Sequence, residues 1–393
     1  MEMKINTQDL MMKIILITPI ATMLQPIFNP INKIVLGIFS IVLLYNYLRK
    51  PIKKIDLIIL SFSFIVFSYS LFNIEKKYLN INMIFYFPIW ALYLTYLTNY
   101  YNEFIDTFVK NLRFVKWLIN IWCFLICLSM IIPSSYEGNG VLVGNFKSFS
   151  EGSFRIAPTI LLMGIIIWLY SAYSGEKNYI LLFIIPFISI ALTGSRTYML
   201  LFLILFIKVF YSFFRKKIYF FLLLIPVLIV IWNMVVNTAI ADKFYDAINN
   251  KYVTDPLARF TSGRSVFWDG EIDLFFKARM IEQLFGGGLT SSFTKNMIIS
   301  NQAIWAHNDF LEVLNAHGVV GVYLYITFFI RFYKRAVKSL KIDKISKVIF
   351  LIICIANAMI NGLYVYITAA LAIPFLLQSM NVDFKKINVY RNG

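Results

Sequence analysis

Charged residues are scarce in this chain. Only 15% of its 393 residues are Asp, Glu, Lys or Arg, whereas 60% are hydrophobic and the mean hydropathy is +0.72. Soluble domains have about 25% charged and about 45–50% apolar residues. The composition therefore excludes an ordinary soluble protein and indicates a polytopic membrane protein. The longest polar stretch, residues 237–317, leaves no room for a soluble domain of ordinary size.

Cysteine and histidine are rare as well. The three cysteines, Cys123, Cys127 and Cys354, lie in apolar runs, so neither a disulfide framework nor a cysteine metal site is expected. The glycines at 286–288 are not followed by the Gly-Lys-Ser/Thr of a phosphate-binding loop, and no H-E-x-x-H motif is present. We therefore expect a reaction that is independent of metals and uses no cofactor.

The net charge of +17 first suggests nucleic acid as a partner, but the position of the charges excludes it. The stretch 237–317 holds seven Lys/Arg and nine Asp/Glu and is therefore slightly acidic. The positive charge lies instead in short links between apolar runs, such as 49–54, 215–217 and 331–347. Basic links of this kind set the orientation of a membrane protein.

Apolar runs predict the spans, since a helix needs about 20 apolar residues to cross a bilayer. We expect an all-α polytopic membrane protein with about 12 transmembrane helices and one long extracytoplasmic loop that contains short amphipathic helices. The predicted spans are 13–29, 32–48, 55–73, 80–98, 114–132, 156–173, 178–193, 197–213, 218–236, 318–333, 346–363 and 364–380.

The basic links place the N-terminus and the C-terminal tail in the cytoplasm, and the first apolar run is expected to be a retained span. Residues 1–236 then hold transmembrane helices 1–9. Residues 237–317 are expected to form a large extracytoplasmic loop, and residues 318–393 to hold helices 10–12 and the cytoplasmic tail.

This topology gathers distant polar residues on one face. The outer loops are 133–155, 193–196, 237–317 and the turn at Asn361-Gly362. Lys76 and Lys77 lie in a further outer loop, against the charge rule. The chemically interesting residues of the outer face are Arg155, Arg196, Arg259, Arg264, His307 and His317.

Two helices are expected in the long loop. Residues 265–284 alternate apolar and charged side chains at helical spacing, which predicts an amphipathic helix lying on the membrane surface and ended by the glycines at 286–288. Residues 304–316 predict a second helix, with Gly318 just after its end.

Arginine and histidine are the candidates for chemistry. Arg196, at the start of a predicted span, is either an interfacial anchor or a ligand of a diphosphate. Arg264, in a predicted turn, is either a solvated charge or a second ligand of the same group. The planar guanidinium group matches the oxygen atoms of a phosphate. His307 is either a structural or capping residue or a general base. His317 is better explained by bonding to the last carbonyls of its helix.

The motifs that carry these residues resemble those of the O-antigen ligase/polymerase superfamily of bacterial envelope enzymes. They are T-G-S-R-T at 193–197, S-G-R-S-V-F-W at 262–268, the glycine-rich bend at 286–288, and A-H-N-D-F-L-E-V-L-N-A-H-G-V-V-G at 306–321. The last motif is the most specific. The resemblance implies an O-antigen polymerase-like membrane glycosyltransferase in the bacterial inner (cytoplasmic) membrane. Its active face would lie in the periplasm, with residues 237–317 as the large periplasmic catalytic loop.

The resemblance also implies the chemistry. A glycan moves from undecaprenyl diphosphate to a sugar hydroxyl, with Arg196 and Arg264 on the diphosphate and His307 as the base. Candidate supporting residues are Arg155, Arg259, Asp309 and Glu312. Either of the two carboxylates would orient the imidazole, or both are solvated charges on a helix face.

Several functions remain open at this point. Richness in Phe, Ile, Tyr and Asn favours a polymerase of O-antigen, capsule or exopolysaccharide, while the motifs fit equally an O-antigen ligase that acts on lipid A–core. The rivals from other classes are a polysaccharide flippase or other transporter, and a structural membrane subunit. The expected partners are an undecaprenyl-diphosphate-linked oligosaccharide, membrane lipid and a chain-length co-polymerase.

Overall fold

The computed structural model describes residues 6–28, 30–138, 144–214, 264–340 and 342–382, with only the backbone at Arg196 and 209–214. These residues are helical, apart from loops and one isolated bridge between Tyr136 and Phe146. The helices before the gap are α1 (Thr7–Leu24), α2 (Ile31–Arg49), α3 (Lys54–Phe72), η1 (Lys76–Tyr78), α4 (Met83–Lys110), α5 (Leu112–Met130), η2 (Pro133–Ser135), α6 (Ser153–Ser174), η3 (Lys177–Phe183), α7 (Ile184–Leu192) and α8 (Arg196–Phe214). Those after it are α12 (Arg264–Lys277), α13 (Met280–Phe285), α14 (Ser291–Ser300), α15 (Asp309–Ser339), α16 (Lys344–Ile360) and α17 (Ile367–Asn381). The all-α prediction is confirmed for this part of the chain.

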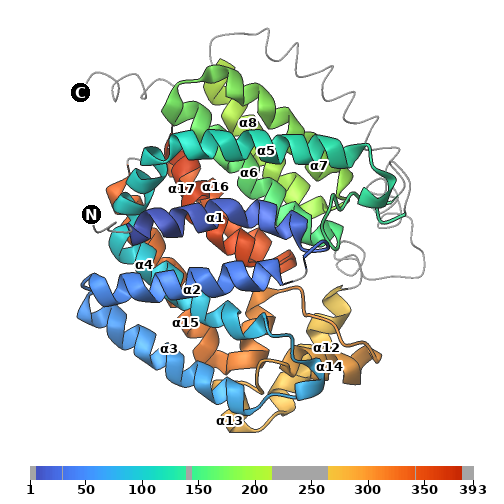
Figure 1. Ribbon diagram of the computed structural model, residues 1–393. Coiled ribbons are helices and arrows are strands. Elements are labelled where there is room, and N and C mark those ends of the chain that lie inside the picture. Colours follow the sequence, from blue (N-terminus) through green and yellow to red (C-terminus); the bar gives the residue numbers. More distant parts are fainter. Residues whose placement is uncertain (1–5, 29, 139–143, 215–263, 341, 383–393) are drawn as a thin grey trace.

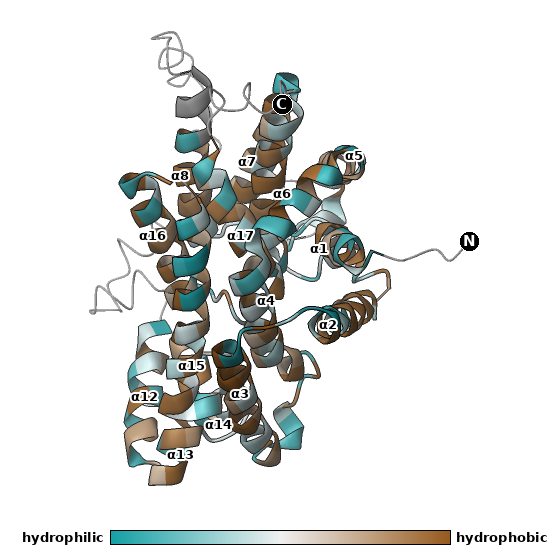
Figure 2. Cartoon of the chain, turned by 90° about the vertical axis from the view of Figure 1, so that its left-hand side faces the viewer, coloured by the Kyte–Doolittle hydropathy of each residue, from teal (hydrophilic) through white to brown (hydrophobic). Residues whose placement is uncertain are grey.

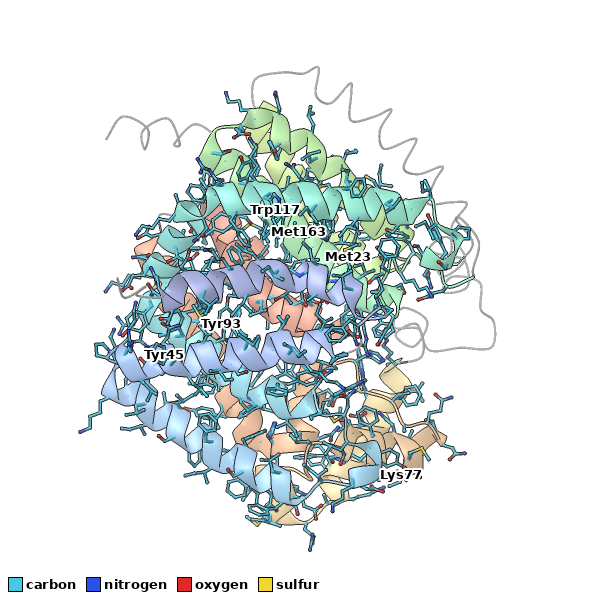
Figure 3. The ribbon with its side chains drawn as sticks, in the orientation of Figure 1. Met23, Tyr45, Lys77, Tyr93, Trp117 and Met163 are labelled. Atoms are coloured by element: carbon cyan, nitrogen blue, oxygen red, sulfur yellow. The ribbon has the colours of Figure 1, made fainter. Side chains whose placement is uncertain are left out.

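Long helices lie side by side and give the bundle two distinct ends (Figure 1). At one end the Thr7 hydroxyl donates to Asn46 at 2.7 Å, and Lys116 pairs with Glu176 at 2.8 Å. At the other end lie the loops that follow α1, α3, α5, α7 and α16, together with α12 and α14. Figure 3 shows Met23 and Lys77 toward this second end and Tyr45 toward the first. We call the second end the loop end.

The core lies around α4, α6 and α17, whose apolar side chains are buried on nearly all sides. A helix that is apolar all round is stable only inside a protein or a membrane. The outer helices α2 and α3 are instead brown over most of their surface in Figure 2 and expose residues such as Leu48 and Phe72. Large apolar side chains exposed in this number indicate a surface that faces lipid.

The predicted spans coincide with helical segments, except 218–236, which lies outside the described residues. Six described helices are long and apolar enough to cross a membrane: α1, α2, α3, α5, α6 and α15. The segments at α7, α8 and α17 are shorter. The chain is therefore a multi-pass membrane protein, and the number of twelve spans stays a prediction.

The predicted arrangement of the long loop needs correction. The expected helix over 265–284 is two helices, α12 and α13, because the backbone of Arg279 is extended (φ −62°, ψ 148°). Its apolar residues do not share one face, since Phe275 is buried while Phe276 is 70% exposed. Instead of lying alone on a membrane surface, α12 packs against α14 and α15. Helix α14 was not predicted.

The second predicted helix begins at Asp309 rather than at residue 304, because the Asn308 side chain caps it there. Its expected end, directly before Gly318, is confirmed by the backbone. Gly318 interrupts α15 with φ +68° and ψ −169°, and the helix then resumes as the predicted span. A Cβ at Gly318 would lie 2.3 Å from the carbonyl oxygen of Leu284, so only glycine allows α13 to approach this kink.

Gly318→Ala should therefore destabilise the protein by at least about 2 kcal/mol, through left-handed strain and the backbone clash. The matched control is Gly37→Ala in α2, where nothing lies within 4 Å of the added methyl group. Thermal unfolding of the detergent-solubilised protein measures both. Equal unfolding midpoints for the two variants would contradict the packing of α13 against this kink.

Candidate active site

A cavity of about 470 Å³ opens at the loop end of the bundle. Its walls come from α1, α2, α4, α6, α17 and the segment 301–308 that leads into α15. The lining combines amides, hydroxyls, aromatic rings, one arginine and one histidine. Its residues are Thr18, Thr22, Gln25, Asn32, Val35, Leu36, Asn80, Asn82, Tyr86, Phe154, Arg155, Pro158, Trp305, His307, Val365, Tyr366, Ile367 and Thr368.

The backbone around His307 is fixed from both sides. The Ala306 amide donates to Oε1 of Glu312 at 2.6 Å, and the Ala306 carbonyl accepts from Trp268 Nε1 at 2.6 Å. On the other side, Oδ1 of Asn308 accepts from the Phe310 amide at 3.0 Å as the cap of α15. His307 itself has φ +53°, a left-handed conformation that only surrounding contacts maintain in a residue other than glycine.

Electrostatics keep the His307 ring neutral. Burial, and secondarily the positive charge of Arg264, lowers the pKa of His307 to about 4. At neutral pH the imidazole therefore has an unprotonated ring nitrogen that accepts a proton. It lines the cavity in this form.

Arg264 lies beside the cavity as the first residue of α12. Its side chain is half-buried, and Nη1 donates to the Ile360 carbonyl, the last of α16, at 2.6 Å. A cation at a helix C-terminus is favourable because the free carbonyls carry partial negative charge. The interpretation as a solvated turn charge is therefore wrong.

Arg155 enters the cavity from the first turn of α6. It pairs with Glu151 at 2.6 Å, and Glu151 in turn accepts from Gln25 Nε2 at 2.8 Å. Asn32 donates to Gln25 and extends this chain along the wall. Burial raises the pKa of the Tyr366 hydroxyl, and the charges of Arg264 and Arg155 oppose that rise, which places both arginines near this ring.

Asp309 and Glu312 are buried, so their interpretation as solvated charges is wrong. Asp309 is fully buried, and its Oδ2 accepts from the Tyr325 hydroxyl at 2.9 Å and from the amides of Leu363 and Tyr364 at 2.6 and 2.8 Å. It thereby attaches the 361–366 loop to α15. Glu312 accepts from the Ala306 amide next to His307, and no hydrogen bond among the described residues joins either carboxylate to the imidazole ring.

His317 has a structural environment of a different kind from the one expected. It lies fully buried at the end of the first helical segment of α15, directly before the Gly318 kink, as predicted. Nδ1 lies 2.7 Å from Oγ of Ser70, and Nε2 lies 3.3 Å from the Tyr364 hydroxyl. The ring centroid of Phe87 lies 4.2 Å from that of His317. These contacts replace the expected bonds to terminal carbonyls, and His317 does not line the cavity.

The other predicted site residues are only partly located. Arg196 is the first residue of α8, and the adjoining turn lies at the loop end, where the Phe146 amide donates to the Leu192 carbonyl at 2.8 Å. The Arg196 side chain and all of Arg259 lie outside the described residues. The predicted outer loops that the structure describes thus lie together at the loop end.

A buried polar network that the sequence did not suggest joins α12, α14 and α15. Glu271 is fully buried and accepts from Asn296 Nδ2 at 2.6 Å and Asn315 Nδ2 at 2.5 Å, while Lys295 donates to Asn315 Oδ1 at 2.6 Å. Burial raises the pKa of Glu271 to about 7. The network fixes α12, and with it Trp268 and Arg264, against the start of α15.

Sequence reasoning also missed most of the cavity wall. Asn32 lies in the first turn of α2, and Asn80 and Asn82 lie directly before α4. All three stand at the ends of predicted spans on the same side as His307, and their amides were the available signal. Trp305 and Tyr86, whose ring centroids lie 5.9 Å apart, complete this wall.

Comparison with known proteins gives one match. Residues 181–326 match the family model described as O-antigen ligase. The match over this range supports the resemblance to the O-antigen ligase/polymerase superfamily. The matched range includes Arg196, Arg264 and His307, and it ends within α15. No curated protein and no solved structure matches the chain.

The match of residues 181–326 to this family indicates a ligase- or polymerase-like function in lipopolysaccharide biosynthesis. Members are membrane glycosyltransferases or ligases that work on lipid-linked oligosaccharides, which is consistent with an enzyme of the bacterial inner membrane. The match lends no support to a chain-length co-polymerase as partner.

Asp309→Ala should lower the free energy of unfolding by about 3 kcal/mol or more, since three buried donors lose their acceptor. Asp309→Asn retains an acceptor oxygen and should cost less. Asp273→Ala is the control, because its exposed pair with Lys277 contributes little. Thermal unfolding of all three variants, compared with the parent protein, measures the differences. A stable Asp309→Ala variant would contradict the role of this carboxylate in attaching the loop.

Proposed function

We propose that the protein is a polysaccharide polymerase that transfers a glycan from undecaprenyl diphosphate to the terminal sugar hydroxyl of another lipid-linked repeat unit. The observation that carries this proposal is the neutral, backbone-fixed His307 in a cavity lined by amides and aromatic rings, with Arg155 in its wall and Arg264 beside it. The product is O-antigen, or a capsular or exopolysaccharide.

His307 acts as the general base in this proposal. The acceptor hydroxyl gives its proton to the unprotonated imidazole nitrogen as its oxygen attacks the anomeric carbon of the donor. The bond from that carbon to the diphosphate oxygen breaks, and the diphosphate keeps the electron pair. Direct displacement inverts the anomeric centre, and the imidazolium then releases its proton to water.

The arginines stabilise the departing diphosphate. It leaves as an anion, so fixed cations lower the barrier without a metal ion and without a proton donor. Arg264 and Arg196 are assigned to this role, with Arg155 and Arg259 in support. The bond from Nη1 of Arg264 to the Ile360 carbonyl holds this guanidinium group beside the cavity.

The cavity is proposed to take the sugars next to the reacting bond. Its volume of about 470 Å³ falls in the range of small-molecule sites. Trp305, Tyr86 and Tyr366 supply flat apolar faces, while Asn32 and Asn82 supply amide groups. The buried Oδ1 of Asn82 has no hydrogen-bond partner among the described residues, and a sugar hydroxyl that reached it would supply one.

A ligase that transfers glycan to lipid A–core is the second candidate, because the matching family model has that description. In both cases the loop end faces the periplasm, as the basic residues at the opposite end of the bundle predict. The family match favours an enzyme over a flippase.

His307→Ala should lower the rate of glycan transfer about 10²- to 10⁴-fold, the usual contribution of a general base. The assay follows release of undecaprenyl diphosphate by purified protein from a synthetic lipid-linked repeat unit. Gln302→Ala, an exposed position in the same segment, is the control and should keep the parent rate. A normal rate in His307→Ala would exclude this residue as the base.

The same variant in the native host separates the two candidates. For a polymerase, the surface polysaccharide ladder should collapse to core with one repeat unit. For a ligase, core should carry no repeat, and lipid-linked polymer should accumulate.

The pH profile tests the electrostatic part of the proposal. Because the pKa of His307 is lowered to about 4, transfer should stay constant on mild acidification and fall to half near pH 4 as the ring protonates. Arg264→Gln removes the repulsive charge, so the midpoint of the residual activity should move to higher pH. A parent midpoint near 6.5 that Arg264→Gln leaves unmoved would contradict the proposal.

A further inference from the structure

A second cavity, of about 280 Å³, lies far from His307 between α4 and the C-terminal part of α15. Its lining contains four basic side chains and one hydroxyl group. The residues are Thr98, Arg331, Lys334, Arg335 and Lys338. We call it the basic cavity.

Three of these cations have no acidic partner among the described residues. Arg331 is neutralised by Asp56, to which its Nε donates at 2.9 Å, and Asn99 holds the same carboxylate at 3.1 Å. Lys334, Arg335 and Lys338 are exposed and form none of the described ion pairs. The cavity therefore has a net positive charge of about three, and an anion would compensate it.

The length of α15 places the basic cavity at the opposite membrane interface. Lys334 follows Asp309 by 25 residues, which corresponds to roughly 35–40 Å of helix. A bilayer measures about 30 Å across its hydrocarbon core and about 40–45 Å with its headgroups. With His307 at one headgroup layer, Lys334 reaches the other.

An apolar stripe leads along α15 to these lysines. Tyr323, Ile326 and Ile330 are exposed and, at spacings of three and four residues, share a helix face with Lys334 and Lys338. Exposed apolar residues on a spanning helix face lipid chains. A molecule with acyl chains on the stripe would bring its headgroup to the basic cavity.

We propose that the basic cavity binds a phosphate ester, supplied by the headgroup of an anionic phospholipid of the cytoplasmic leaflet. Basic pockets between transmembrane helices on that side are suited to such headgroups. This site is independent of glycan transfer, and it requires only that α15 spans the membrane.

The test measures binding of phosphatidylglycerol to the full-length protein in neutral detergent, by native mass spectrometry. Lys334→Gln/Lys338→Gln should weaken binding about 25-fold, because each of the two cations removed should contribute a factor of about five. Lys344→Gln/Lys347→Gln, which removes the same charge from the start of α16 outside the cavity, should retain the parent affinity. Lys334→Arg/Lys338→Arg keeps the charge and should also retain it.

Two further ligands identify the source of the phosphate. Phosphatidylcholine, which has no net charge, should bind much more weakly than phosphatidylglycerol, and soluble glycerol phosphate should compete poorly because it lacks acyl chains. Equal binding of the two lipids, or equal losses in the two glutamine variants, would overturn the site. Glycerol phosphate that binds as tightly as phosphatidylglycerol would overturn the assignment to lipid. Unfolding midpoints measured without lipid show whether each variant is folded.

Discussion

The two hydrogen bonds to the backbone of Ala306 are the constraint on which the site depends. One comes from the carboxylate of Glu312 on α15 and the other from the indole of Trp268 on α12. Neither bond touches a reacting group, yet together they hold the left-handed residue His307 at the cavity wall. A left-handed histidine is stable only when its neighbours fix it. The elements that support α12 therefore support the position of the imidazole as well.

That support extends through buried polar groups. The Glu271 network holds α12 and α14 on α15, and Asp309 attaches the loop that carries Tyr366 to the same helix. Buried polar groups are costly unless they are bonded, and once bonded they specify one arrangement. The first turns of α15 thus bind the helices α12 and α14 on one side and the loop between α16 and α17 on the other, next to the cavity. The spanning bundle places these parts at one end.

The sequence predicted the helical class and the sharing of one face, because apolar length and loop charge follow simple physical rules. It also selected His307 over His317, and the burial of His317 away from the cavity is consistent with that choice. It did not predict that α12 ends at Lys277 or that α14 exists. The bounds of α12 and α14 depend on how these helices pack against α15, and the periodicity of a short stretch of sequence contains no information about that packing. Nor did it predict the burial of Asp309 and Glu312, because a carboxylate beside a histidine looks the same in sequence whether it bonds the ring or the backbone.

The most direct test of the account is the structure of the protein with an undecaprenyl-diphosphate-linked oligosaccharide, determined by cryo-electron microscopy in a lipid nanodisc. The account predicts the diphosphate on the guanidinium groups of Arg264 and Arg196, and a sugar hydroxyl about 3 Å from a ring nitrogen of His307. The amides of the cavity wall would contact the same sugar. A diphosphate bound away from these arginines, or an imidazole with no sugar within reach, would contradict it.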